Sequence, residues 1–162
     1  MAKLELNSAQ NKWFVENQQG QQELTLTATA IQQSVVIYKC NNSTLVVKGK
    51  VNGITVDNCS NFNLIFESAI STVDIINSKR IQVQVEKTTP TLTINKTNNI
   101  KVFLSKESLD SEIVSSLSNE INIYVPTAEG DDTVELPIPD TLTTKIVNGK
   151  LETTVGSKAV GV

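Results

Sequence analysis

A repeat of nineteen residues runs through most of the chain, and it restricts the possible folds more than any other feature. Cys40, Cys59, Ser78 and Thr97 stand at this interval, each at the end of a similar four-residue phrase. The same step aligns apolar residues in three further columns: Leu26, Leu45, Leu64, Val83, Val102 and Ile121; Val35, Ile54, Val73 and Leu92; and Ile37, Val56, Ile75, Ile94 and Ile113. Self-similarity at a period of this length is typical of solenoids.

The column positions recur at every second residue within a repeat, as at Leu64 and Phe66, which predicts strands with one face in the core. Two or three short strands in nineteen residues leave no room for a helical crossover. Each strand therefore pairs in parallel with its equivalent one coil later, ~4.8 Å away. Because parallel crossovers are right-handed in nearly all cases, we expect an all-β, right-handed parallel β-helix of about five to six coils between Leu24 and Tyr124.

The composition agrees with strands and excludes several classes of function. Hydrophobic residues make up 39 % of the chain, mostly Val, Ile and Leu, with only 4 % aromatic residues. The net charge is −3 and no basic cluster is longer than Lys79-Arg80, so we expect no nucleic-acid partner. No signal-peptide pattern or long apolar run is present, and we expect a cytoplasmic protein without membrane insertion.

The chain contains no histidine, which excludes His-based acid–base catalysis and almost all ordinary zinc and copper sites. We expect no metal, no cofactor and no enzymatic activity. Cys40 and Cys59 lie in one column, where stacked side chains point the same way and do not favour a disulfide, so we expect free thiols.

The repeat ends near Val125-Pro126, and we divide the chain into residues 1–126 and residues 127–162, two parts of one functional domain. The second part contains strand-like runs over residues 142–147 and 150–155, separated by Asn148-Gly149, a strong signal for a two-residue hairpin turn. An isolated hairpin is marginal in water, so this one packs on its own solenoid or on another chain. A hairpin that caps a neighbour would make a strand-swapped homodimer.

Several stretches of the chain, in this order, resemble the C-terminal domain of cyclase-associated protein. The stretches include Tyr38-Lys-Cys40, Val47-Lys-Gly-Lys-Val-Asn52, Ile54-Thr-Val-Asp-Asn-Cys59, Asn122-Ile-Tyr-Val-Pro126 and Glu135-Leu-Pro-Ile-Pro139. The resemblance covers approximately residues 10–156. The family's helical region, proline-rich stretch and WH2 segment are not in this sequence, which leaves open an excised domain or a short family member.

The resemblance implies a cytoskeleton-associated protein that binds monomeric actin, preferably with ADP bound. It further implies that the protein regulates actin turnover by promoting nucleotide exchange or by holding monomers. It also implies a homodimer with exchanged C-terminal strands. The residues expected at that dimer interface are Val134, Leu136, Ile138, Leu142, Ile146, Asn148, Gly149 and Leu151.

Two basic stretches are the candidate actin contacts. Lys48 and Lys50, together with Asn52, match a family stretch and place two cations at one corner, where the alternative is an ordinary solvated corner. Lys79 and Arg80 form the second candidate, and Arg80 is the only arginine of the chain. Its planar fork is suited to carboxylates.

Other interpretations of the same residues stay open. Arg80 is the one residue that could serve a GTPase-activating module of the tubulin cofactor C type, and a purely structural dimerisation scaffold is a third hypothesis. Asp57 and Asp74 face outward on adjacent coils, where solvated carboxylates are a better account than a glycosidase pair. The outward residues Val46, Ile65 and Phe103 predict a face covered by the segment around Trp13-Phe14 or by a partner.

Overall fold

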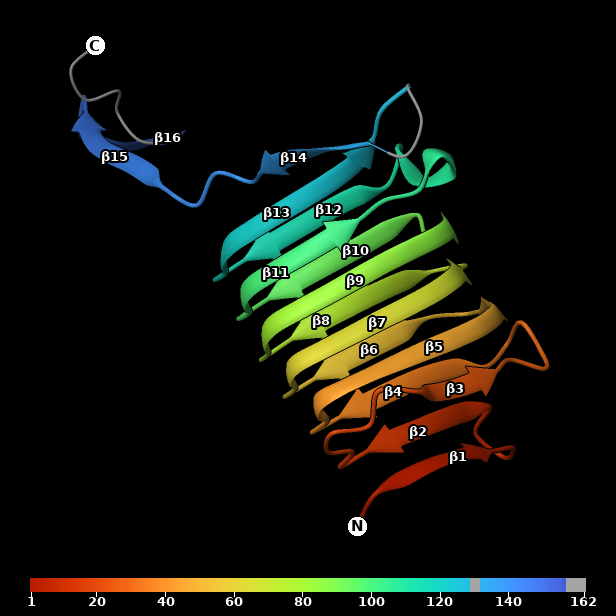
Figure 1. Cartoon of the computed structure of the whole chain (residues 1–162). Coiled ribbons are helices and arrows are strands. Elements are labelled where there is room, and N and C mark those ends of the chain that lie inside the picture. Colours follow the sequence, from red (N-terminus) through yellow and green to blue (C-terminus); the bar gives the residue numbers. More distant parts are fainter. Residues whose placement is uncertain (129–131, 157–162) are drawn as a thin grey trace.

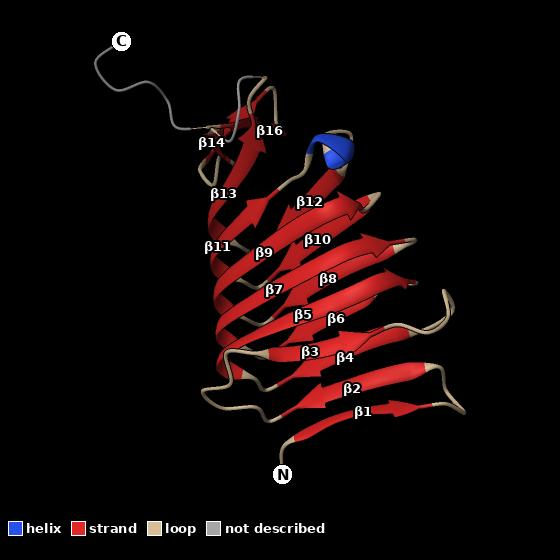
Figure 2. Ribbon diagram, turned by 45° about the vertical axis from the view of Figure 1, so that its right-hand side comes forward, coloured by secondary structure: helices blue, strands red, loops and turns tan. Residues whose placement is uncertain are grey.

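In this computed structural model the chain winds into a solenoid whose coils form two long sheets that face each other (Figures 1 and 2). Successive strands of the coils belong alternately to one sheet and to the other. The structure describes residues 1–128 and 132–156. Sheet A has seven strands, in the order β1 (Lys3–Asn7), β2 (Lys12–Glu16), β4 (Ser34–Tyr38), β6 (Ile54–Asp57), β8 (Thr72–Ile76), β10 (Thr91–Asn95) and β12 (Glu112–Ser116). Sheet B also has seven, in the order β14 (Thr133–Pro137), β13 (Asn119–Pro126), β11 (Asn98–Phe103), β9 (Lys79–Thr88), β7 (Ser60–Ala69), β5 (Asn41–Val51) and β3 (Leu24–Thr27).

Neighbouring strands within each sheet pair in parallel, except for β1 with β2 and β13 with β14 at the ends. The strands of the inner coils follow the predicted alternation. In β8, Val73 and Ile75 are buried, whereas Thr72 and Asp74 are half-buried on the outer face. The predicted all-β solenoid of stacked coils is confirmed.

The nineteen-residue step holds in the middle of the solenoid but not at its ends. Val35 pairs with Ile54 at this step. Leu26, however, pairs with Val47, 21 residues later, so its predicted alignment with Leu45 is wrong. At the other end Val102 pairs with Ile123 and not with Ile121.

Both longer coils carry their two extra residues at the turn from sheet B to sheet A. The first of these turns comprises residues 28–33, and the second contains the short 3-10 helix η1 (Lys106–Ser108). Ile113 consequently pairs with Leu92, and its predicted place in the Ile94 column is also wrong. Because an insertion of two residues keeps every side chain on the same face of its strand, the alternation alone does not reveal the shift.

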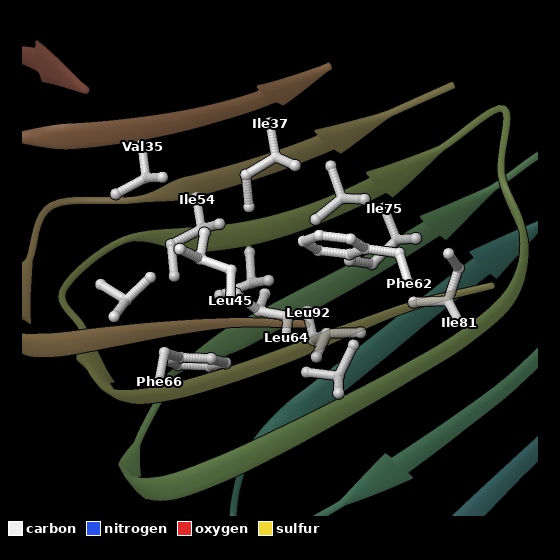
Figure 3. Close-up of a cluster of buried hydrophobic side chains, with 14 of the residues drawn as sticks. Val35, Ile37, Leu45, Ile54, Phe62, Leu64, Phe66, Ile75, Ile81 and Leu92 are labelled. Carbon is white, nitrogen blue, oxygen red and sulfur yellow. The ribbon is translucent and has the colours of Figure 1, made fainter. Parts of the chain in front are cut away.

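The core lies between the two sheets and consists of stacked aliphatic columns with two phenylalanines. Figure 3 shows Val35, Ile37, Ile54, Ile75 and Leu92 from sheet A meeting Leu45, Phe62, Leu64, Phe66 and Ile81 from sheet B. All ten are at most 1 % exposed. Burial of each such side chain contributes about 1.5–3 kcal/mol, so these columns hold the coils together.

The turn from sheet A to sheet B carries the column that begins with Cys40. The main-chain N–H of each member donates to the side chain of the member one coil later: Cys40 to Cys59 Sγ at 3.4 Å, Cys59 to Ser78 Oγ at 3.1 Å, Ser78 to Thr97 Oγ1 at 3.4 Å, and Thr97 to Ser118 Oγ at 3.1 Å. Both cysteines are buried free thiols. A hydrogen bond with the Cys40 side chain, together with burial, raises the pKa of the Cys59 thiol. The column therefore acts as a polar ladder inside the corner.

Left-handed residues flank this ladder on both sides in successive coils. Asn42, Asn61, Arg80 and Asn99 occupy one flanking column with φ between 50° and 65°. Asn tolerates this conformation better than other non-glycine residues, which explains why Asn recurs at this corner. Arg80 and Glu120, which lies beside Asn99 one coil later, are the members of the column that are not Asn.

The two ends of the solenoid are closed differently. β1 extends sheet A at the N-terminal end, and β14 extends sheet B at the C-terminal end, each as an antiparallel edge strand. β12 is left as the edge strand of sheet A at the C-terminal end.

The predicted hairpin is confirmed with its expected bounds, as β15 (Leu142–Val147) and β16 (Lys150–Val155). Asn148 and Gly149 both have positive φ, 53° and 74°, as a two-residue hairpin turn of this kind requires. Figure 1 shows the hairpin standing away from the stacked coils.

Candidate functional site

The five predicted actin contacts lie on strands of sheet B or directly beyond them, in two separate groups. Lys48 and Lys50 lie near the end of β5, with Asn52 just beyond it, whereas Lys79 and Arg80 begin β9. All five are exposed. In the register of the sheet, Lys79 lies beside Ser60 and Lys50 beside Ser68. Ser60 and Ser68 are eight residues apart on β7. This separation corresponds to ~26 Å along a strand, so the two groups lie at opposite ends of the strands.

The Lys48–Lys50 group sits on a β-bulge that an acidic side chain holds in place. Gly49 has φ +88°, and the pairing of β5 with β7 shifts between Val47 and Lys50. The Gly49 N–H donates to Glu67 Oε2 at 2.9 Å, and Glu67 Oε1 lies 3.4 Å from Lys87 Nζ. The hydrogen bond from Gly49, supported by Lys87 and Lys48, lowers the pKa of Glu67. Glu67 and Lys87 were missed by sequence reasoning because each lies about one coil from its partner along the chain.

The second group opens onto a hollow of about 300 Å³ at the corner of sheet B. Its lining residues are Asn61, Asn63, Arg80, Ile81, Gln82, Asn99 and Lys101. Arg80 Nε donates to Asn61 Oδ1 at 2.8 Å. Lys79 does not line the hollow, whereas Lys101, which the sequence analysis did not single out, does.

An apolar stripe separates the two groups. In the register of sheet B, Val46 lies beside Ile65, Ile65 beside Gln84, and Phe103 beside Tyr124. The Phe103 and Tyr124 rings stack with centroids 4.4 Å apart and an interplanar angle of 14°. Glu135 accepts a hydrogen bond from the Tyr124 hydroxyl, and this bond raises the Tyr124 pKa.

The N-terminal segment does not cover this stripe, so that part of the prediction is wrong. Trp13 pairs with Val35 and Phe14 with Val36, which adds β2 to sheet A on the other side of the solenoid. Trp13 Nε1 donates to Gln33 Oε1 at 3.0 Å, a contact between β2 and the first turn. The stripe is therefore half-buried by its own neighbours and is available to a partner.

The outward carboxylates of sheet A are engaged by neighbouring polar side chains. Asp74 accepts hydrogen bonds from Thr93 and, at 3.2 Å, from Thr72. Asp57 accepts one from Asn77 at 3.4 Å. Among residues 1–128 and 132–156 no group of three or more Cys, Asp or Glu side chains is placed to hold a metal ion. In the same ranges, no helix has the length and apolar character needed to span a membrane.

The hairpin presents an open apolar face. Leu142 pairs with Val155 and Ile146 with Leu151, and all four are between 64 % and 72 % exposed. Thr144 and Thr153, another opposed pair, lie on the same face. Val134 and Leu136 of β14 are also exposed, whereas Ile138 packs against the core. The predicted dimerisation residues thus form accessible surface on the single chain, with Ile138 as the exception.

Comparisons with known proteins agree with one family. The family model described as adenylate cyclase associated (CAP) C terminal matches residues 1–158. The chain is 49 % identical to adenylyl cyclase-associated protein 1 of Bos taurus and 42 % identical to the adenylyl cyclase-associated protein of Dictyostelium discoideum, each over 144 residues. These matches cover 89 % and 88 % of this chain, but only 30 % and 31 % of the relatives.

A solved structure supports the same assignment. The crystal structure of cyclase-associated protein from Cryptosporidium parvum superposes with a TM-score of 0.89 and 33 % sequence identity, and 96 % of each chain is covered. The likeness therefore includes the N-terminal strands, the coils and the C-terminal hairpin region together. This chain belongs to the family of cyclase-associated protein C-terminal domains.

Proposed function

We propose that this domain binds monomeric actin, preferably in its ADP-bound form, and regulates actin turnover by promoting nucleotide exchange, by sequestering monomers, or by both. The observation that carries the proposal is the family match over residues 1–158. Such a protein acts in the cytoplasm in association with the cytoskeleton, and it does so by binding and not by catalysis.

The outer face of sheet B is the surface we assign to actin. Actin is acidic, and this face carries Lys48 and Lys50 at one end and Lys79 and Arg80 at the other. The apolar stripe through Ile65 lies between them. A half-buried apolar strip with cations on both flanks suits a protein partner, because apolar contact supplies affinity and charge supplies orientation.

Binding to ADP- and ATP-loaded actin, followed by release of a fluorescent nucleotide, tests this function. Lys48→Glu is expected to weaken binding, while Lys12→Glu, an exposed residue on sheet A with the same change in net charge, leaves it unchanged. Equal loss in both variants would indicate a net-charge effect and would count against the assigned face. Absence of saturable binding by the wild-type chain would overturn the function itself.

We further propose that residues 127–162 are the dimerisation part of the domain and that two chains exchange their hairpins. The open apolar face formed by Leu142, Ile146, Leu151 and Val155 supports this proposal. The partner's β12 is an edge strand with unpaired main-chain groups at the same end of the solenoid. A strand of the hairpin could satisfy those groups.

Sedimentation of the intact chain tests the dimer. Ile146→Lys combined with Leu151→Lys is expected to give a monomer, because two charges would enter an apolar interface. Exchanging Lys145 and Glu152, an opposed pair on the other face of the hairpin, keeps the net charge and is expected to leave the dimer intact. A wild-type chain that sediments as a monomer would refute the exchange.

Two other functions predict different results. A GTPase-activating module that uses Arg80 would accelerate GTP hydrolysis by a partner, and Arg80→Ala would abolish this effect. A structural scaffold would dimerise without any affinity for actin. The actin-binding and hydrolysis assays together separate the three possibilities.

A further inference from the structure

The hollow around Arg80 is lined by cationic and amide side chains without a carboxylate. Arg80 and Lys101 supply the two positive charges, and Asn61, Asn63, Gln82 and Asn99 supply amide groups. The lining comes from three adjacent strands, β7, β9 and β11, within two neighbouring columns of the sheet. The lining therefore carries two positive charges and amide donors but no negative charge, which is complementary to an anion.

Neither cation is paired with an acidic side chain in the part of the chain that the structure describes. Arg80 donates from Nε to Asn61, and among the described residues its guanidinium makes no other hydrogen bond and no salt bridge. A guanidinium has five N–H donors, so four are free for a ligand. Lys101 likewise has no acidic partner within residues 1–128 and 132–156. The bond to Asn61 restrains the arginine, which lowers the entropy cost of binding.

The backbone at Arg80 is left-handed, as it also is at Glu120 near the end of the same column. Arg80 has φ +54° in the column where the preceding two coils and the following coil carry Asn. A left-handed conformation costs a residue other than Gly or Asn about 1–2 kcal/mol, so Arg is an unfavourable choice for the turn itself.

We propose that this hollow binds a phosphate dianion, either as a free phosphate or as a phosphorylated side chain of another protein. Two cations match two negative charges, whereas a single carboxylate would leave one cation without a counter-charge. The phosphoryl group carries about −1.5 to −2 charges at pH 7 and three acceptor oxygens, and Arg binds such oxygens in pairs. A hollow of about 300 Å³ has room for the group and for part of what it is attached to.

The intact chain permits a direct test, because its only arginine gives one assignable Nε–Hε resonance in NMR spectra. Titration with inorganic phosphate at constant ionic strength is expected to shift this resonance and the side-chain amide of Asn61 in a saturable manner, and acetate is expected to shift them far less. A peptide with one phosphoserine and its unphosphorylated form make up the second arm. Binding of either phosphate probe supports the site, and the tighter one identifies the source.

Three variants test whether phosphate binds at Arg80 and Lys101. Arg80→Lys keeps the charge but loses the fork, and Lys101→Gln removes one charge; each is expected to weaken phosphate affinity about tenfold or more. Lys12→Gln on sheet A is the matched control and is expected to bind like the wild type. The proposal is wrong if phosphate gives no saturable shift, if acetate binds equally well, or if the Arg80 and Lys101 variants bind like the control.

Discussion

The main-chain N–H of Cys59 donates a hydrogen bond to the Ser78 hydroxyl, 3.1 Å away and one coil farther along the solenoid. Ser78 in turn donates from its own N–H to Thr97. The side chain of each corner residue thus satisfies the backbone of the preceding coil, and both partners are buried. The nineteen-residue step of the column is a requirement of hydrogen bonding as well as of packing.

Ser78→Ala is expected to reduce the free energy of unfolding by about 1–3 kcal/mol, because it leaves the buried Cys59 N–H without an acceptor. Ser78→Cys is the matched control and is expected to cost less, since a thiol already accepts this bond from Cys40. Urea unfolding of both variants measures the difference. Equal stability of the alanine and cysteine variants would show that the ladder contributes no net hydrogen-bond energy.

Gly49→Ala is expected to destabilise the domain more than Gly20→Ala. Both glycines have positive φ, +88° and +64°, and a left-handed alanine costs about 1–2 kcal/mol at either place. At Gly49, however, the added Cβ would lie 3.3 Å from the Ala28 carbonyl oxygen, whereas at Gly20 it would meet nothing within 4 Å. Thermal unfolding of the two variants isolates this contact, and equal losses would argue against a tight approach of β5 to the first turn.

Stability is expected to decrease as the pH falls below the ordinary Glu value of about 4.3, in part because of Glu67. The pKa of Glu67 is lowered in the folded chain, so its contribution is present above the unfolded-state pKa and is lost as the pH falls through the folded-state pKa. Glu67→Gln is expected to flatten this part of the pH profile. The check is denaturant unfolding of wild type and variant between neutral and acidic pH, and parallel profiles would exclude the contribution.

Phe62→Ala is expected to cost about 3–5 kcal/mol, because Phe62 is fully buried between the sheets and the cavity cannot collapse easily. Phe103→Ala on the outer face is expected to cost clearly less, although it loses the ring stack with Tyr124. Chemical denaturation measures both. A larger loss at Phe103 would mean that the outer stripe, and not the inner columns, dominates the stability.

Regular features of the sequence predicted much of this fold. The columns through Val35 and Ile54 and the hairpin turn at Asn148-Gly149 follow from local periodicity and turn chemistry, and the structure has them where they were expected. The two-residue insertions at the end coils could not be found in this way. They preserve the inward face of each strand, and the register follows from main-chain pairing that the alternation does not show.

The candidate site was less predictable than the fold. Lys48 and Arg80 could be named from charge and resemblance, but their surroundings come from residues on other coils. Glu67 approaches Gly49 from the next strand, and Lys101 joins Arg80 across β9 and β11. Such neighbours are 18 to 21 positions apart in the chain, and only a correct register brings them together.

The difference in residue number between the inner coils and the end coils determines how the length of the domain can change. Between the first turn and η1 the coils repeat at nineteen residues, whereas the step is 21 to 22 residues in the first coil and 21 in the last. Duplication or loss of one inner coil would move the N-terminal strands and the C-terminal hairpin apart or together by one strand spacing, ~4.8 Å, and leave both ends unaltered. The length of the domain can therefore change only in steps of one coil, while its two ends stay the same.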